Sequence, residues 1–175
     1  MSKHHPEEGP RQSARYPFIA EHRGGPLTKQ HHRLLMKWAR ECAGHVLSLA
    51  GNNIDHRLTE ALTLAEEWEN CRIAAGVCMK ASQEAHAAAR ETDDPVRKAI
   101  ARSVGQAAAT AHMADHSLGG AFYALRAVKL AHADVQREKE WQYQKLAGFP
   151  DPIAKIVHTL WQQKDLDKKI ESNRK

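Results

Sequence analysis

Hydrophobic residues recur every three or four positions along most of the chain from residue 27 onward, which is the spacing of one face of an α-helix. In the first such segment, Leu34, Trp38 and Val46 share a face until Gly51 interrupts the pattern. The pattern predicts helices over residues 28–50, from Asp55 through Trp68, from Cys71 or Ile73 to Glu91, over 95–116, over about 120–146, and from Pro150 through Trp161.

Two of these helices carry strong start signals. Asp94 followed by Pro95 places a capping side chain directly before a proline that the first helical turn tolerates, and Pro150-Asp151-Pro152 repeats the arrangement. The chain offers no convincing pair of β-strands. We therefore expect an all-α fold, an antiparallel helical bundle of five to six helices with short connections.

The two ends of the chain differ from its middle. Residues 1–26 hold four of the seven prolines and show no sustained period, so they are predicted to form a flexible N-terminal extension. Residues 27–163 are expected to form a single helical domain, because this length allows one sizeable core. Residues 164–175 are predicted to be a charged C-terminal tail.

The net charge of +5 suggests nucleic-acid binding, but its distribution argues against it. Residues 1–26 contribute +1 and residues 164–175 contribute +2, which leaves only +2 for the body of the chain. Such a body has no basic stripe comparable to a nucleic-acid footprint. Aromatic residues are only 6% of the chain, so stacking platforms for single strands are not expected either.

The number and spacing of the cysteines indicate whether the protein works in a reducing or an oxidising compartment. Cys42, Cys71 and Cys78 are an odd number with no CxxC spacing, and no signal peptide precedes them. We expect a reduced, cytoplasmic protein. No stretch approaches 18 consecutive apolar residues, so no membrane contact is predicted.

The segment 105–116 is the most informative one in the chain. It places His112 and His116 four residues apart in a run of small residues, so a continuous helix would turn both side chains to one face. Between residues 74 and 133, 19 of 60 positions are alanine, which permits close approach of helix backbones. The two histidines could form a packed pair in a helix seam, part of a surface that binds a partner or ligand, or half of a metal site.

Helical spacing indicates which residues could join these histidines. If the chain turns near residues 53, 71 and 118, then Trp38, Trp68, His112 and Tyr123 lie at one level, with His45 and His116 within two or three turns. Asp115 lies beside the shared face of the two histidines and could orient one of them from the side. The predicted binding residues are Trp38, His45, Trp68, His112, Asp115, His116 and Tyr123.

Neither a metal nor a catalytic site is expected. If the chain also turns near residue 93, His86 and His112 lie about 18 Å apart along the bundle axis, which is too far for one ion. An HxxxH pair without a third ligand falls short of the zinc patterns that carry a mechanism. No GxSxG, Walker loop or GxGxxG occurs, so we predict no enzyme activity, no metal and no cofactor.

Several segments carry a family resemblance. They read Trp38-Ala39-x-x-Cys42-Ala43-x-His45-Val46, Ala85-His86-Ala87-Ala88-Ala89-Arg90, Arg102-x-x-Gly105-Gln106-Ala107-x-Ala109-Thr110-Ala111-His112-Met113-Ala114-Asp115-His116-x-x-Gly119-x-Ala121-x-Tyr123-Ala124, and Arg137-Glu138-x-x-Trp141-Gln142. Over about residues 27–162 the chain resembles a family of immunity proteins from bacterial polymorphic toxin systems.

The resemblance implies an α-helical, non-catalytic protein whose partner is a cognate protein toxin. Because the body is slightly basic, the expected toxin surface is acidic or mixed in charge. The alternative interpretation is a small-molecule-binding or metal-binding helical bundle that uses the cluster of His112 and His116. A homodimer is left open, and no nucleic-acid or membrane partner is expected.

Overall fold

The computed structural model describes residues 16–172, and in this range the only regular structure besides helices is a single β-bridge between Ala20 and Leu27. The α-helices are α1 (Lys29–His45), α2 (His56–Glu69), α3 (Ala75–Glu91), α4 (Pro95–Ala109), α5 (His116–Leu130), α6 (Val135–Ala147), α7 (Asp151–Gln163) and α8 (Leu166–Glu171). Short 3-10 helices are η1 (Tyr16–Phe18), η2 (Glu21–Arg23) and η3 (Leu47–Ala50). The prediction of an all-α fold is confirmed. The described residues hold eight α-helices rather than five or six.

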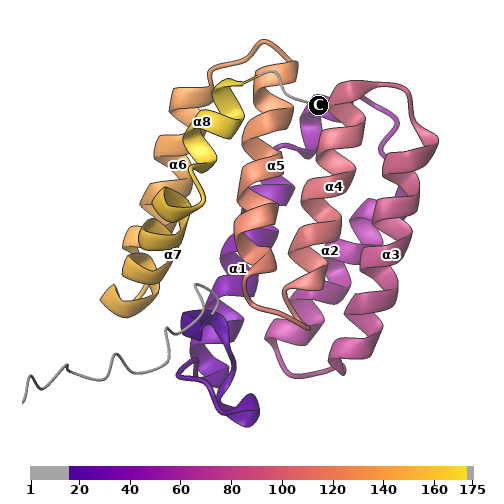
Figure 1. The fold of residues 1–175 in the computed structure, drawn as a ribbon. Coiled ribbons are helices and arrows are strands. Elements are labelled where there is room, and N and C mark those ends of the chain that lie inside the picture. The colour runs from indigo at the N-terminus through magenta and orange to yellow at the C-terminus, as the bar shows by residue number, and fades with distance from the viewer. Residues whose placement is uncertain (1–15, 173–175) are drawn as a thin grey trace, which may run out of the picture.

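Helix α4 lies at the centre of the molecule. It packs against α1, α2, α3 and α5, while α6, α7 and α8 lie on the far side of α5 (Figure 1). From Ala99 to Ala109 every residue of α4 is buried except Arg102 and Gln106. This helix is therefore a core element that presents a single polar stripe to solvent.

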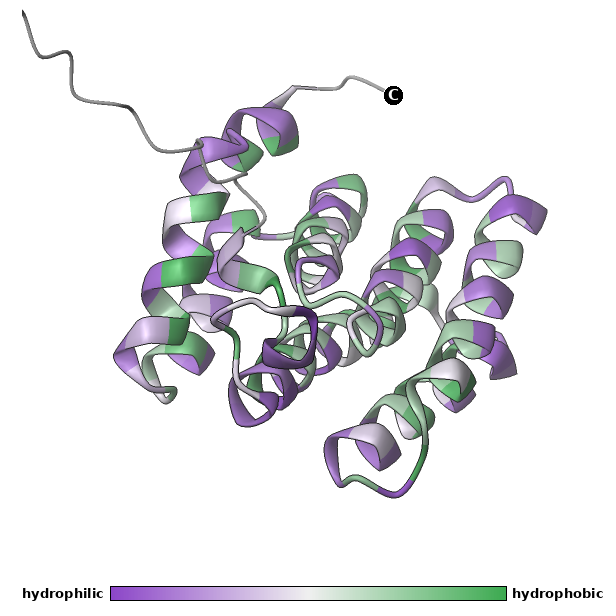
Figure 2. Cartoon of the chain, turned by 60° about the horizontal axis from the view of Figure 1, so that its bottom comes forward, coloured by the Kyte–Doolittle hydropathy of each residue, from purple (hydrophilic) through white to green (hydrophobic). Residues whose placement is uncertain are grey.

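The helices are amphipathic, as the sequence pattern predicts. Most of them show a hydrophobic side and a hydrophilic side, and the hydrophobic sides turn toward neighbouring helices (Figure 2). The core they form includes Leu35, Trp38, Ile100, Leu125 and Ile153, all of them 1% exposed or less. None of the helices in residues 16–172 combines the length and apolar character needed to cross a bilayer.

Small residues bring α4 close to its neighbours. A Cβ added to Gly120 in α5 would lie 3.6 Å from the Ala107 Cα in α4 and 3.2 Å from the Ala39 Cβ in α1. Two buried hydroxyls strengthen the same contacts, because Ser82 donates to the Gly105 carbonyl at 2.8 Å and Ser103 donates to the Gly120 carbonyl at 2.7 Å. Small side chains and serine hydroxyls thus replace bulky packing where the helices come nearest.

The predicted helix over residues 95–116 is wrong at its C-terminal end. Helix α4 ends at Ala109, and α5 begins at His116 after a turn. The Thr110 hydroxyl donates to the Gln106 carbonyl, and the amides of Thr110 and Ala111 bond carbonyls three residues back, so the last turn tightens and stops. His112 and His116 therefore belong to different elements and do not share one helix face.

The predicted helix over about 120–146 is two helices. It is interrupted after Leu130, where His132 adopts a left-handed conformation with φ of 54°, and α6 restarts with Asp134 accepting a hydrogen bond from the Arg137 amide at 3.0 Å. The glycine pair 119–120, next to the turn expected near residue 118, lies inside α5. These glycines serve close packing instead of chain reversal.

Parts of both predicted terminal segments pack on the bundle. Residues 1–15 of the predicted extension lie outside the described residues, but Phe18 and Ala20 are buried at 5% and 7% exposure. In the predicted tail, Leu166 and Ile170 of α8 are buried, and Lys129 Nζ donates to the carbonyls of Ile170 and Glu171. Where the domain begins and ends stays a prediction.

Candidate functional site

A polar stripe crosses the three adjacent helices α3, α4 and α5. Arg102 and Gln106 lie four residues apart on α4 and are the residues through which its second half reaches solvent. His86 and Arg90 have the same spacing on α3. His116 and Tyr123 lie two turns apart on the half-buried side of α5. We call this set the basic face; it comprises His86, Arg90, Arg102, Gln106, His116 and Tyr123.

Two glycines shape the basic face. The His86 ring lies over Gly105, where an added Cβ would come within 2.8 Å of the ring atoms. The Gln106 side chain lies over Gly119, where an added Cβ would come within 2.6 Å of Gln106 Oε1. That same oxygen is 2.7 Å from His116 Nδ1. The three helices therefore present interlocked polar side chains in fixed positions.

The charges on this face are positive. Burial lowers the pKa of His86, and the nearby cations Arg102 and Arg90 lower it further. Neither arginine forms an ion pair or hydrogen bond with any residue in the range 16–172. The face combines donors and positive charge on a rigid support.

Two of the predicted binding residues have structural partners elsewhere. Trp38 is 1% exposed, and its indole nitrogen donates to the Gln142 carbonyl at 3.1 Å. His45 stacks on Trp141 with ring centroids 3.8 Å apart, and its Nδ1 lies 2.7 Å from an oxygen of the buried Glu138. Both residues tie α1 to α6 through these contacts.

Trp68 and His112 meet in a pocket. It has a volume of about 350 Å³ and lies between the N-terminal segment, the start of α1, the connection from α2 to α3, and the end of α4. We call it the Trp68–His112 pocket; its lining is Ala20, His22, Arg23, Lys29, His32, Arg33, Trp68, Cys71, Ile73, Ala75, Ala111 and His112. Asp115 lines a smaller adjoining hollow that His112 and His32 also border.

His32 forms the buried back of the Trp68–His112 pocket. Its Nε2 lies 2.5 Å from the Thr110 carbonyl, so it carries the proton and donates, and its ring meets Trp68 edge-on with centroids 4.9 Å apart. Burial lowers the pKa of His32, which keeps the ring neutral at pH 7. The contact joins α1 to the turn after α4 and so shapes the pocket.

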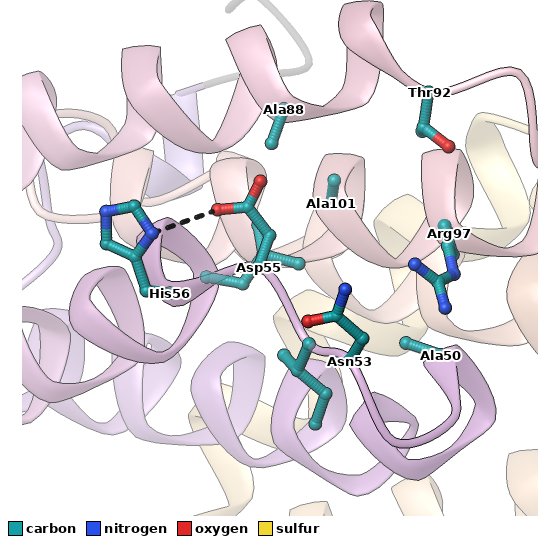
Figure 3. A pocket seen from close by; sticks show the side chains of 10 residues that line it. Ala50, Asn53, Asp55, His56, Ala88, Thr92, Arg97 and Ala101 are labelled. Carbon is teal, nitrogen blue, oxygen red and sulfur yellow. Dashed lines mark ion pairs between the residues drawn. The ribbon is translucent and has the colours of Figure 1, made fainter.

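A larger pocket of about 450 Å³ lies between the start of α2, the end of α3 and the start of α4, at the other end of these helices from the Trp68–His112 pocket (Figure 3). Its lining mixes the polar residues Asn53, Asp55, His56, Thr92 and Arg97 with the apolar residues Ala50, Ile54, Leu58, Ala88 and Ala101. Asp55 is bound to Arg57, and Arg97 lies 3.9 Å from Asp94. The charges around this pocket have partners within the protein.

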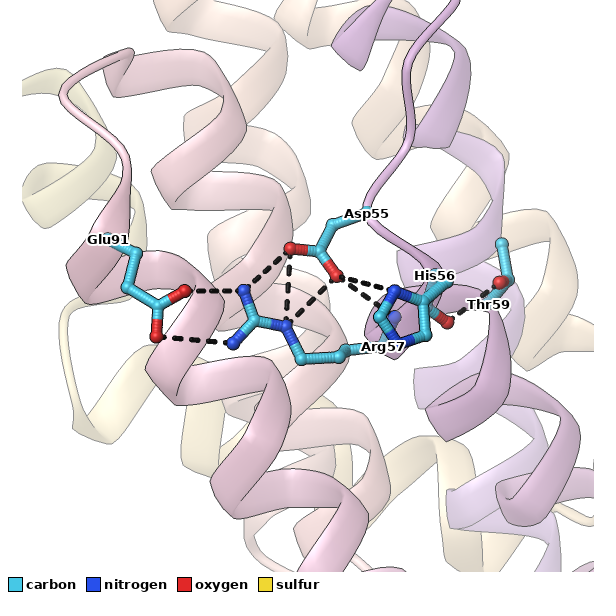
Figure 4. Close-up of polar contacts among 5 residues, drawn as sticks. All are labelled: Asp55, His56, Arg57, Thr59 and Glu91. Carbon is cyan, nitrogen blue, oxygen red and sulfur yellow. Dashed lines mark hydrogen bonds and ion pairs between the residues drawn. The ribbon is translucent and has the colours of Figure 1, made fainter.

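Arg57 links two helices at the same end of the bundle as the larger pocket (Figure 4). Its Nη2 lies 2.7 Å from Asp55 Oδ2 and 2.6 Å from Glu91 Oε2, so it joins the start of α2 to the end of α3. Hydrogen bonds from Arg57 lower the pKa of both carboxylates. These contacts give Arg57 a structural role, because they join two helices.

Metal ligation has no support within residues 16–172, where no three His, Cys, Asp or Glu side chains gather as a metal site requires. Cys42 and Cys78 are buried, and burial raises the pKa of each thiol, to about 11 for Cys78. Cys71 is exposed and lines the Trp68–His112 pocket.

Sequence reasoning missed several residues of these sites. Arg102 and Gln106 carried a usable signal, since they are polar residues four apart in an otherwise small and apolar helix. His32 and Arg23 carried none, because the turn that brings the N-terminal segment against residues 110–112 is a tertiary feature.

Comparison with known proteins identifies the family of this chain. No curated protein and no solved structure matches it. Residues 25–149 match the family described as Imm-5 like putative immunity protein, and this range contains α1 to α6 and the whole basic face. The chain therefore belongs to the Imm-5 like putative immunity protein family.

Proposed function

We propose that this protein is an immunity-type inhibitor that neutralises a cognate bacterial protein toxin by binding it, without catalysis of its own. The family match over residues 25–149 is the observation that carries the proposal. The basic face also supports a binding role, because it offers hydrogen-bond donors and positive charge on three packed helices.

We further propose that the toxin binds the basic face. Arg90 and Arg102 are solvent-accessible and lack ionic partners within residues 16–172, so a partner's carboxylates could pair with them without displacing internal contacts. The matching toxin surface is acidic. Complementary charge of this kind accelerates association and fixes orientation.

The support beneath this face favours tight binding. His86 and Gln106 lie over glycines, and Gln106 is held by His116, so these side chains lose little freedom when a partner docks. A surface built on three packed helices also keeps its shape better than a loop. The proposed binding mode is therefore rigid docking of a preformed face.

Protection of cells tests the proposal. Products of the genes beside this one should be expressed in a bacterial host, and one that arrests growth should be neutralised by co-expression of this protein. The double variant Arg90→Glu/Arg102→Glu should lose protection. The matched double variant Lys80→Glu/Lys155→Glu changes two exposed cations elsewhere and should keep it. Equal protection by both variants would show that the basic face is not the binding surface.

The small-molecule alternative keeps one specific observation in its favour, the Trp68–His112 pocket. Its volume of about 350 Å³ falls within the range of small-ligand sites. The pocket uses His112 but not His116, which is bonded to Gln106 on the basic face. A ligand there would occupy a different region from the proposed toxin surface.

A further inference from the structure

The Trp68–His112 pocket has an unusual balance of charge. Arg23, Lys29 and Arg33 contribute three cations to its lining, and among residues 16–172 no aspartate or glutamate belongs to that lining, although Asp115 borders the adjoining hollow. None of these three side chains forms an ion pair with another residue in the range 16–172. Glu21 lies close, where its carboxylate accepts from the Lys29 amide at 3.2 Å. The pocket as a whole favours an anion.

The other lining residues combine histidines with apolar and aromatic side chains. Trp68 forms an aromatic wall, and His32 fixes its ring edge-on. Ile73, Ala75 and Ala111 contribute aliphatic surface. An aromatic wall beside small aliphatic residues suits a planar ring, which stacks against indole at offset or edge-on geometry. The volume accommodates a ring system of that kind together with an acidic group.

We propose that the Trp68–His112 pocket binds a small planar aromatic carboxylate, with the ring against Trp68 and the carboxylate at Arg23, Arg33 and Lys29. Guanidinium groups bind carboxylates through two parallel hydrogen bonds, which selects a planar acid over a neutral ring. The proposal stands independently of toxin binding, because the pocket and the basic face share no residue.

Titration of the full chain with 2-naphthoate tests the proposal, with 2-naphthamide as the neutral control of equal shape. Two-dimensional NMR should show saturable shifts at Trp68 Nε1 and at the amides of Ala75 and Ala111. The naphthamide should bind at least about tenfold more weakly, since it lacks the charge that the cations recognise. No shift at millimolar naphthoate, or equal binding of both compounds, would overturn the proposal.

Variants locate the ligand. Arg33→Gln should weaken naphthoate binding by about tenfold, and Trp68→Leu should abolish it. Arg72→Gln is the matched control, because Arg72 neighbours the pocket in sequence but pairs with Glu67 outside it at 2.8 Å. If Trp68→Leu lowers stability, His112→Ala provides a second test, because it removes an exposed side chain from the pocket lining. This variant should also weaken naphthoate binding. Unchanged affinity in both Arg33→Gln and His112→Ala would contradict the assignment.

A further titration with a phosphate compound distinguishes a carboxylate ligand from a phosphate ligand. Naphthyl phosphate carries the same ring with a larger anionic group. Tighter binding of the carboxylate supports the proposal, whereas a phosphate that binds more than about tenfold more tightly would overturn the carboxylate assignment.

Discussion

Gly105 and Gly119 are the residues that allow polar side chains to lie flat on the basic face. Each occupies a point where an added Cβ would come closer than 3.0 Å to a side chain of the adjacent helix. Without these glycines, His86 and Gln106 would have to point away from the seam. Two residues that carry no functional group thus determine the shape of the proposed toxin-binding surface.

We predict that Gly105→Ala destabilises the fold and displaces His86. Overpacking of this kind costs about 1–3 kcal/mol, and the better helix propensity of alanine offsets up to about 1 kcal/mol of that. Urea unfolding should therefore show a net loss of about 1 kcal/mol. Gly76→Ala is the control, since nothing lies within 4 Å of its added Cβ and no loss is expected there. Equal stability of the two variants would contradict the close packing at Gly105.

We also predict that stability falls as the pH drops below neutrality. Burial lowers the pKa of His32 and His86 from the usual 6.5, so the unfolded chain takes up protons before the folded protein does. The free energy of unfolding should decrease as the pH falls through about 6.5 toward the folded-state pKa values, and remain unaffected by these groups above it.

Thermal melts between about pH 8 and pH 5.5 measure this effect. His32→Gln can still donate to the Thr110 carbonyl but cannot titrate, so its melting temperature should depend less on pH. His31→Gln, one position away on α1, should retain the wild-type dependence. A His32→Gln profile parallel to that of the wild type would contradict the role of burial.

At the level of single residues, the sequence predicted which side chains lie near one another better than it predicted what each of them does. Helical spacing correctly brought Trp68 and His112 together, because the turn between α2 and α3 lies near the expected residue 71. Trp38 does not line that pocket, because packing directs its indole toward the Gln142 carbonyl. Spacing along a helix gives the level of a side chain, but rotation of the helix determines which neighbour it meets.

Helix starts are the best-defined features at the level of elements. The Asp94 carboxylate accepts from the Val96 amide at 2.8 Å and from the Arg97 amide at 3.0 Å, which caps the central helix α4 as its sequence signal predicted. We predict that Asp94→Ala lowers the free energy of unfolding by about 1 kcal/mol.

The adjacent residue provides the control for this prediction. Asp93 is exposed and forms no hydrogen bond or ion pair with another residue in the range 16–172, so Asp93→Ala removes the same charge without removing the cap. Urea unfolding should show little change for Asp93→Ala. Comparable losses in both variants would mean that charge at the helix end, rather than the cap, stabilises α4.

Helix ends were predicted less well than helix starts. Alanine-rich sequence continues smoothly from α4 into residues 110–115, and no glycine or proline marks the stop. The interruption depends on the Thr110 hydroxyl and on the bond between His32 and the Thr110 carbonyl, which joins segments 78 residues apart. Local propensity carries no information on such a contact.

At the scale of the whole molecule, the two proposed binding regions both carry positive charge. The basic face lies across α3 to α5, and the Trp68–His112 pocket lies at the end of the bundle formed by the start of α1 and the end of α4. The overall charge of +5 agrees in sign with the two proposed anionic partners, but it does not locate either region. Location came from the fold, which gathers cations that are dispersed along the chain.

We predict that association with the toxin weakens as salt rises. Ions screen exposed charges over about 8 Å at physiological ionic strength, so the association rate should fall severalfold between low and high salt. Surface plasmon resonance across a salt series measures this rate. The Arg90→Glu/Arg102→Glu variant should associate slowly at every salt concentration. A rate independent of salt would contradict recognition through charge.

The ratio of protein to toxin needed for inhibition tests the central claim most directly. Purified toxin should be titrated with purified protein while toxin activity is followed. Neutralisation by binding predicts a linear loss of activity that ends at a fixed stoichiometric ratio and does not deepen with time. Progressive inactivation by substoichiometric amounts would reveal catalysis, and full activity at saturating protein would show that the chain does not neutralise that toxin.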